Sequence, residues 1–442
     1  MPATIAWPPI VIGAALCLGA PVAAAEPWTI DRAVAVALEH SPDSRLAHAR
    51  VEGAEALVQQ ARSAWLPQVS VSGRYTDTNS PMAAFGSVLN QRAFNFGLDF
   101  NHPGQIDDLN ATSTVAYNLY SGGHATAGKK AAEAGAAAAG YDLNAARNEL
   151  AAEVVKAALG LQKAREAVGA VEGGVRAYEA AVSVARARFE AGQLLKADLL
   201  SLEVQLAQTR ETRSSARHGA ALAERAFWFA LGIDAGDEPV EFVHDDPSLA
   251  RLTVPDTRDF SRRPELLALD ARLRAAEAMV EAARSGRRPS INAFAGYQYD
   301  RGWKLNRDGD SWLAGMAVDL NIFDGGQTSG KIRQAAAEVE QVKEMRRKAE
   351  LGIGLEVEQA RLAHDDAVER LAVTASAVEQ AGESAALSRA RFQKEALLTA
   401  DLIGAESRLL DARLRRTVAG CDERLAVVDL RRALGVDPLP QP

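Results

Sequence analysis

The sequence predicts a mostly α-helical protein that also has four β-strands of the membrane-spanning kind and an internal duplication. Two very long stretches, 124–190 and 327–395, contain no proline and are rich in alanine, which is typical of long helices. Four other segments alternate apolar with polar or small residues over about ten positions, the length of a transmembrane β-strand. Motifs recur 203 residues apart, which indicates that one unit is present twice.

Composition narrows the class of protein. Hydrophobic residues make up 48% of the 442 residues and aromatic residues only 6%, and much of the apolar part is alanine. Alanine buries little area, and each Å² is worth only about 25 cal/mol, so closely packed long helices are favoured over a thick core. The net charge of −8 argues against a nucleic-acid partner. Two cysteines exclude a disulfide framework and a cysteine-ligated zinc site.

The first 25 residues read as a signal peptide. An apolar run at 10–20 is followed by Ala23, Ala24 and Ala25 before Glu26, an apolar segment and a cleavage site of the usual kind. Residues 1–9 carry no lysine or arginine, which is a departure from the pattern. No later stretch reaches 18 apolar residues, so the sequence predicts an exported protein without a transmembrane helix.

Each copy has the same order of elements: helix, strand, loop, strand, very long helix, tight turn and shorter helix. The helix at 29–65 should end before Pro67, because the residue preceding a proline is disfavoured in the α conformation. At about 1.5 Å per residue, the long helix of 124–190 would measure about 100 Å. The two shorter helices of a copy together have about that length, so they are expected to stack end to end beside it.

The predicted boundaries follow from the duplication. In copy one, 119–123 (LYSGG), 188–200 and 231–234 (LGID) match 322–326 (IFDGG), 391–403 and 434–437 (LGVD) of copy two. The predicted domains are a signal peptide at 1–25, a first repeat at 26–232, an equatorial linker at 233–263, a second repeat at 264–437 and a tail at 438–442. After its first helix, the first repeat has strands at 67–78 and 110–120 and long helices at 124–190 and 195–232. After its first helix, the second repeat has strands at 290–299 and 310–323 and long helices at 327–395 and 398–434.

The four predicted strands are too few to form a closed β-barrel from one chain. Four strands cannot close a barrel, and open strand edges are not tolerated in lipid, so membrane strands would require several chains to associate. One alternative is that the strands form two hairpins of a small soluble sheet and that the helices form a soluble coiled coil. A soluble periplasmic coiled-coil scaffold protein is therefore the alternative from a different functional class, and it predicts extraction without detergent.

The chain resembles the outer-membrane efflux protein family, the TolC-like channels, over essentially all of 28–437. The resemblance lies in the motifs YSGG at 120–123, FDGG at 323–326, ARFEAG at 187–192 and ARF at 390–392. It implies a homotrimer with a twelve-stranded β-barrel in outer-membrane lipid and a long periplasmic α-helical barrel. It also implies two partners at the far tip, a periplasmic adaptor (membrane fusion protein) and an inner-membrane pump.

The resemblance also suggests residues of functional interest. Asp198 and Asp401 follow the two tip turns, and the family's periplasmic gate is lined by aspartates; the position one turn after Asp401 is Gly404. The alternative is that both are first-turn carboxylates that stabilise the helix dipole. The expected adaptor contacts at the tip are Arg188, Phe189, Gly192, Arg391 and Phe392, with packing between the helix pairs as the alternative role. The expected strand-to-helix turns are Gly122, Gly123, Gly325 and Gly326. Because Glu395 replaces the glycine in copy two, its turn is expected to be built differently.

The implied function is a passive exit duct in the bacterial outer membrane, part of a tripartite efflux pump for drugs or metal ions. The outer-membrane component of type I protein secretion is the related alternative. No catalytic residue, cofactor or metal ligand is predicted. Gly325 to Lys331 has P-loop spacing, but Ile332 replaces the required Ser or Thr. The neighbouring side chains of His244-Asp245-Asp246 and His364-Asp365-Asp366 point in different directions, which argues against metal binding.

Overall fold

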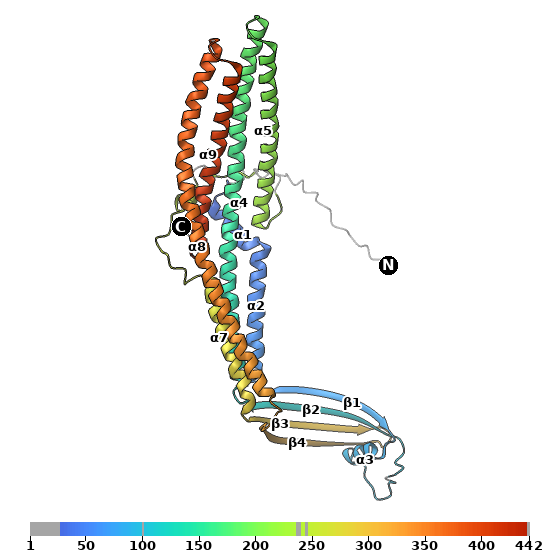
Figure 1. Ribbon diagram of the computed structural model, residues 1–442. Coiled ribbons are helices and arrows are strands. Elements are labelled where there is room, and N and C mark those ends of the chain that lie inside the picture. Colours follow the sequence, from blue (N-terminus) through green and yellow to red (C-terminus); the bar gives the residue numbers. More distant parts are fainter. Residues whose placement is uncertain (1–26, 100, 236–239, 244–245, 440–442) are drawn as a thin grey trace, which may run out of the picture.

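The computed structural model is a long helical rod with a β-sheet that leaves one end of it sideways (Figure 1). The structure describes residues 27–99, 101–235, 240–243 and 246–439; the predicted signal peptide at 1–25 and the residues His244 and Asp245 lie outside them. The elements are α1 Ile30–His40, α2 Pro42–Ser63, β1 Gln68–Thr78, α3 Pro81–Asn90, β2 Ile106–Tyr120, α4 His124–Glu190, α5 Lys196–Leu231, α6 Pro247–Ala250, α7 Pro264–Arg284, a 3₁₀ turn η1 Ser285–Arg287, β3 Ser290–Gly302, β4 Arg307–Asp319, α8 Gln327–Gln393 and α9 Thr399–Ala433. The predicted fold class, mostly helical with four strands, is confirmed.

The two long helices give the rod its length. α4 and α8 have 67 residues each, which at 1.5 Å per residue amounts to about 100 Å. Each begins directly after a glycine pair, and Gly123 and Gly326 have φ angles of 96° and 90°. Glycine adopts this left-handed conformation without a steric cost, so the pair lets the chain turn sharply from strand into helix. Within the described residues, no helix is both long and apolar enough to cross a membrane.

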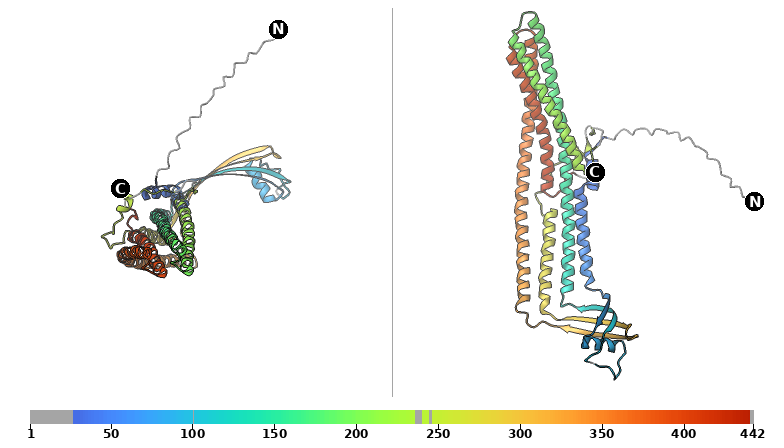
Figure 2. Two further views of the ribbon diagram at one scale, coloured as in Figure 1. Left: turned by 90° about the horizontal axis from the view of Figure 1, so that it is seen from above. Right: turned by 90° about the vertical axis from the view of Figure 1, so that its right-hand side faces the viewer.

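The shorter helices are stacked end to end beside the long ones (Figure 2). Gly232 ends α5 against the start of α2, so closely that a Cβ on it would lie 2.5 Å from the Ser41 Cα. Gly435 ends α9 against the start of α7, where a Cβ would lie 2.7 Å from the Arg263 Cγ. Both glycines have a φ of 71°. The same junction is therefore built twice.

The prediction of one continuous helix over 29–65 is wrong, because the chain breaks at Ser41. Pro42 has no N–H and disfavours the α conformation at the preceding residue, and Ser41 accordingly has φ −59° and ψ 134°. The Ser41 hydroxyl accepts a hydrogen bond from the Asp43 N–H and so caps α2. Gly232 packs directly against the backbone at this break.

The four strands form one antiparallel sheet in the order β1-β2-β3-β4. Successive side chains alternate between two faces, and the register places Val69 opposite Val115 and Val115 opposite Ala295. The apolar face, which includes Val71 and Trp312, is exposed, and each of these two side chains is 78% accessible. The other face carries Ser and Thr. In the described chain, β1 and β4 have no strand on their outer edges.

The strand limits differ from the prediction at both ends of the sheet. β2 begins at Ile106 rather than at 110, because the Asp107 carboxylate accepts hydrogen bonds from the Trp303 and Lys304 N–H groups and ties this end to the next hairpin. β4 ends at Asp319 rather than at 323, because its partner β3 begins only after Pro289, which cannot donate to a ladder. The loop between the two predicted strands of copy one contains the helix α3, Pro81–Asn90.

The middle of the rod carries the largest apolar core, where the linker meets α1 and the end of α5. The Trp28 ring packs edge-on against Phe227 and Trp228 at centroid distances of 5.8 Å and 5.7 Å. The Trp28 N–H donates to the Glu241 carbonyl at 2.6 Å, and the Ile30 N–H donates to the Asp246 carboxylate at 2.7 Å. These contacts bind residues near both ends of the first repeat to the linker.

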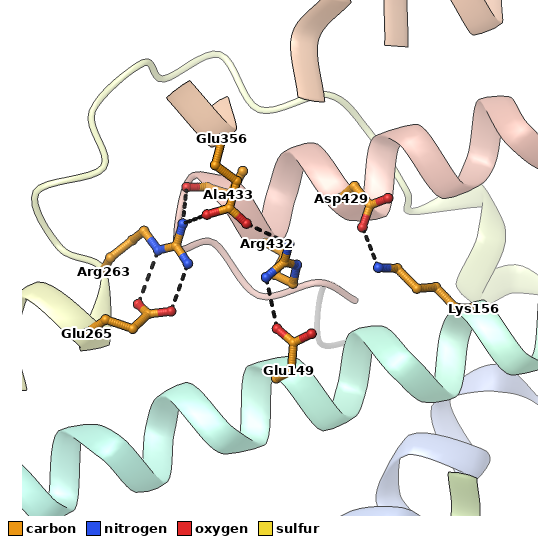
Figure 3. Close-up of polar contacts among 8 residues, drawn as sticks. All are labelled: Glu149, Lys156, Arg263, Glu265, Glu356, Asp429, Arg432 and Ala433. Atoms are coloured by element: carbon orange, nitrogen blue, oxygen red, sulfur yellow. Dashed lines mark hydrogen bonds and ion pairs between the residues drawn. The ribbon is translucent and has the colours of Figure 1, made fainter. Parts of the chain in front are cut away.

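An arginine network joins the second repeat to the first in the same middle part of the rod (Figure 3). Arg263 is buried and donates to Glu265 at 2.7 Å, to Glu356 at 2.5 Å and to the Ala433 carbonyl at 3.2 Å. Arg432 links Glu356 of α8 to Glu149 of α4. The network therefore connects the start of α7, the middle of α8, the end of α9 and the first repeat.

Candidate functional site

The tip of the rod, at the end away from the sheet, consists of two repeat-related turns with the same hydrogen bonds. Between α4 and α5 the Gly192 N–H donates to the Phe189 carbonyl at 2.9 Å. Between α8 and α9 the Glu395 N–H donates to the Phe392 carbonyl at 3.2 Å. Gly192 has a φ of 74° and Glu395 a φ of 61°. The expectation that Glu395 requires a different turn is therefore wrong: it adopts the left-handed conformation itself.

Replacing Glu395 with glycine is expected to stabilise the α8–α9 turn by about 1 kcal/mol, because a side chain in the left-handed region clashes with its own backbone. The midpoint of thermal unfolding, followed by circular dichroism in detergent, should rise. The reciprocal variant Gly192→Glu imposes the same strain on the other turn and should lower the midpoint. A fall in the midpoint for Glu395→Gly would contradict this account.

The four aromatic and arginine residues of the tip are not in equivalent surroundings. Arg188 lies 5.2 Å from the centre of the Phe392 ring and donates to the Phe392 carbonyl at 3.2 Å, so it joins the two hairpins. Phe392 is only 2% exposed. Their repeat counterparts, Arg391 and Phe189, are both exposed.

Asp198 and Asp401 lie in the first turns of α5 and α9. Neither carboxylate has a hydrogen bond or an ion pair among the described residues, and the residues at the two N-caps are Leu195 and Leu398. Both carboxylates are thus free of the hydrogen bonds that a helix cap would make. Gly404, one turn after Asp401, supplies no second carboxylate.

The sequence reasoning missed the two leucines that precede these helices. Leu195 and Leu398 are each 73% exposed, at equivalent positions of the two turns. The sequence did contain a signal for them, because both copies have a large apolar residue where a helix N-cap usually carries a polar one. Together they place repeated apolar contacts at the end of the rod.

The strand-to-helix turns lie at the opposite end, where the sheet meets the rod. Gly122 and Gly325 both have a φ of 66°, and each precedes the glycine that begins a long helix. A Cβ on Gly122 would lie 2.9 Å from the Ser285 carbonyl oxygen, so this turn also packs tightly on the end of α7. The turns are therefore structural junctions between the sheet and the helical wall.

The far end of the sheet is covered by the residues that follow α3. Gln91 is fully buried, and its amide nitrogen donates to the Asp107 carbonyl at 2.8 Å and to the Asp108 carboxylate at 2.9 Å. A Cβ on Gly302 would lie 2.1 Å from the Gln91 Oε1, and one on Gly309 would lie 2.1 Å from the Asn90 carbonyl oxygen. Asp108, Gly302 and Gly309 belong to the polar face of the sheet. The segment around Gln91 thus lies on that face.

The described residues contain no group of three or more His, Cys, Asp and Glu side chains placed to hold a metal ion. Cys421 is buried, and its thiol lies 3.4 Å from the Leu159 carbonyl oxygen. Burial raises the pKa of this thiol, as expected for a small core residue rather than a nucleophile.

Comparison with known proteins gives one family. The profile described as "Outer membrane efflux protein" matches residues 33–232 and 260–436. The two matched segments cover both repeats and omit only the ends and most of the linker.

Among curated proteins, the chain is 26% identical over 339 residues to Protein CyaE of Bordetella pertussis, which covers 74% of this chain and 67% of that protein. It is 27% identical over 332 residues to Fusaric acid resistance protein FusA of Burkholderia cepacia, which covers 70% of this chain and 58% of FusA. Among solved structures, a crystal structure of CusC superposes with a TM-score of 0.80 at 18% identity and covers 92% of each chain.

Proposed function

The chain belongs to the outer membrane efflux protein family, and from this premise we propose that it is the outer-membrane exit channel of a machine that exports drugs or metal ions. One observation supports this most strongly. A sheet with an exposed apolar face and two open edges continues directly into helices about 100 Å long. Lipid tolerates such strands only in a closed barrel, so the chain needs copies of itself.

Three chains would contribute twelve strands, an even number within the range of outer-membrane barrels. The apolar face would then contact lipid, and the polar face would line the passage. The segment around Gln91 would narrow the outer mouth of that passage, since it covers the polar face. The rod would extend into the periplasm.

The tip is proposed to bind a periplasmic adaptor, and through it an inner-membrane pump. The exposed Leu195 and Leu398 and the turns at Gly192 and Glu395 offer repeated apolar and backbone contacts. Arg188, Phe189 and Arg391 would contact the adaptor beside these turns, and the buried Phe392 would hold Arg188 in place. A helical hairpin with apolar side chains is the partner that such a surface suits.

A small-molecule cargo is favoured over a protein cargo by the relationship to FusA, which is named for resistance to fusaric acid. Type I protein secretion remains the related alternative. The two cargoes differ in the pump rather than in this chain, so the genes adjacent to this one are the evidence that separates them.

Removing the carboxylates of Asp198 and Asp401 and measuring cation block of the conductance tests both the channel and the gate. Three chains would bring six carboxylates to one narrow level, which attracts polyvalent cations. In planar bilayers, Asp198→Ala with Asp401→Ala should raise the half-blocking concentration of hexaamminecobalt(III) roughly tenfold, the change that 1.4 kcal/mol of lost attraction produces.

The control is Glu211→Ala, which removes an exposed carboxylate of α5 well away from the tip and should leave the block unchanged. Unchanged block in the double variant would refute the gate assignment. Recovery of the protein as a monomer in the soluble periplasmic fraction, with no conductance, would refute the channel.

A further inference from the structure

An open cavity of about 680 Å³ lies where the sheet leaves the rod (Figure 1). All four strands line it at the ends nearest the helices, and so do the end of α2, the first residues of α4 and the residues that follow α7. Small-molecule sites in proteins commonly have volumes of about 300–1,000 Å³. The cavity is therefore large enough for a drug-sized molecule.

The floor of this cavity belongs to the polar face of the sheet. Among the lining residues, Gln68 pairs with Ala116, and Ala116 pairs with Phe294. Their neighbours along the strands, Val69 and Val115 among them, form the apolar face, because successive side chains of a strand point to opposite faces. In the proposed channel the cavity therefore opens to the passage rather than to lipid.

Phe294 brings an aromatic ring to this polar face. Its strand partner is Gly315, and a Cβ there would lie 2.8 Å from the Phe294 Cζ, so the ring lies against the glycine backbone. The ring is 39% exposed, so part of it remains available for stacking. Because this face points away from lipid in the proposed channel, contact with lipid does not account for the ring.

A guanidinium group is held at the edge of the same cavity. Arg288 Nη1 donates to the Gly122 carbonyl at 3.2 Å, and a Cβ on Gly123 would lie 3.1 Å from this nitrogen. The glycine turn thus fixes the position of the group. Arg288 is exposed and has no ion pair among the described residues. Its remaining N–H groups form a fork that suits a carboxylate.

Asn292 supplies a further donor between the ring and the guanidinium group. It accepts a hydrogen bond from the Asn118 amide at 2.9 Å, which leaves its own Nδ2 without a partner in the described part of the chain. It precedes Phe294 by two positions and so lies beside it on the same face. The carboxylate that lines the cavity, Asp319, lies on β4, across β3 from the turn that Arg288 contacts.

We propose that Arg288, Asn292 and Phe294 form a transit site for aromatic carboxylic acids, whose ring stacks on Phe294 and whose carboxylate binds Arg288 and Asn292. The proposal rests on the proposed channel, since it places the site on the passage. The tip carboxylates lie at the other end of α4, about 100 Å away. This is far beyond the Debye length of about 8 Å, so they do not repel an acid at this site.

Photolabelling of the full-length protein in detergent tests the site directly. The probe is 4-benzoylbenzoate, an aromatic carboxylic acid that attaches to nearby C–H bonds under near-ultraviolet light. It should label peptides that line the cavity, and excess 2-naphthoate should prevent this. Arg288→Gln should raise the half-saturating concentration about tenfold, because a charged hydrogen-bond donor is lost. Phe294→Leu should raise it about threefold, because stacking is lost.

Three controls separate the site from a general effect of charge or of apolar partitioning. Arg287→Gln removes the adjacent exposed arginine, which donates to Ser329 outside the cavity, and should leave labelling unchanged. Uncharged benzophenone lacks the carboxylate, so Arg288→Gln should not alter its labelling. Asp319→Asn removes a negative charge from the cavity and should lower the half-saturating concentration of the acid. Conductance in planar bilayers shows that each variant is folded.

The outcomes distinguish the site from the function on which it rests. Labelling of the cavity that weakens in Arg288→Gln but not in Arg287→Gln supports the site. Labelling scattered over the apolar face, or weakened equally by both arginine substitutions, refutes the site, while a mass of three chains with conductance leaves the channel standing. A monomeric mass without conductance refutes the channel and with it the transit role, whether or not the acid binds.

Discussion

Replacing Gly232 with alanine is expected to destabilise the protein by about 2–4 kcal/mol, the sum of a strained backbone and an overpacked contact. The φ of 71° belongs to the region that side chains avoid, and the added Cβ would lie 2.5 Å from the Ser41 Cα and 2.9 Å from the Pro42 Cδ. Backbone and a proline ring cannot move aside as a flexible side chain does. The midpoint of thermal unfolding in detergent measures the loss.

Gly192→Ala is the matched control, because Gly192 has a φ of 74° and open space around it. It carries the backbone strain alone and should cost about 1 kcal/mol. The difference between the two variants isolates the close approach at the junction of α5 and α2. If both variants lose the same stability, the close approach of Gly232 to Ser41 and Pro42 contributes nothing to the cost.

Replacing Arg263 with methionine is expected to cost about 3 kcal/mol, because the variant removes a buried guanidinium that binds Glu265, Glu356 and the Ala433 carbonyl, and Glu356 keeps only Arg432. Methionine fills most of the arginine's volume, so the loss reports the polar contacts rather than a cavity. Denaturant titration of the detergent-solubilised protein measures it. Arg284→Met removes an exposed ion pair with Glu281 and should change stability by less than about 0.5 kcal/mol.

The effect of Arg263→Met should also depend on pH. Burial raises the pKa of Glu265, but the hydrogen bonds and the charge of Arg263 outweigh it, so the pKa lies below its ordinary value of 4.5. A lowered pKa stabilises the folded state above the ordinary value, and this stabilisation disappears as the pH falls through the lowered one. The difference between wild type and variant should therefore shrink in acid. A constant difference down to pH 3 would exclude Glu265 as a contributor.

Much of the fold could be predicted because local signals and the duplication agree. A glycine pair after an alternating segment marks each start of a long helix, and the constant offset of 203 residues makes one copy a check on the other. The exceptions have local causes. The break at Ser41 depends on one proline inside an otherwise helical pattern, and the early start of β2 depends on the Asp107 contacts with a hairpin about 200 residues away.

The site was predictable only in outline. The tip turns were located by the ARF motifs, but the opposite fates of Arg188 and Arg391 depend on which hairpin lies beside them, and the sequence does not give that. The glycine rule failed at Glu395 because a single strained residue is tolerated where the surrounding hydrogen bonds hold it. The burial of Gln91 on the sheet could not be predicted, because its neighbours Asp108 and Gly302 come from two different strands.

The helical wall of one chain ends in α8 on one side and in α2 and α5 on the other (Figure 2), and these two unlike edges have a genetic consequence. A ring closed head to tail needs every chain to offer both edges, so one subunit with a spoiled α8 edge interrupts the circle. In a cell that makes normal and spoiled chains in equal amounts, random assembly of the proposed three-chain ring leaves roughly one ring in eight composed of normal chains alone. If the proposed ring forms, substitutions on this edge should therefore be dominant over the wild-type allele, whereas a mutation that merely prevents synthesis of the chain should be recessive.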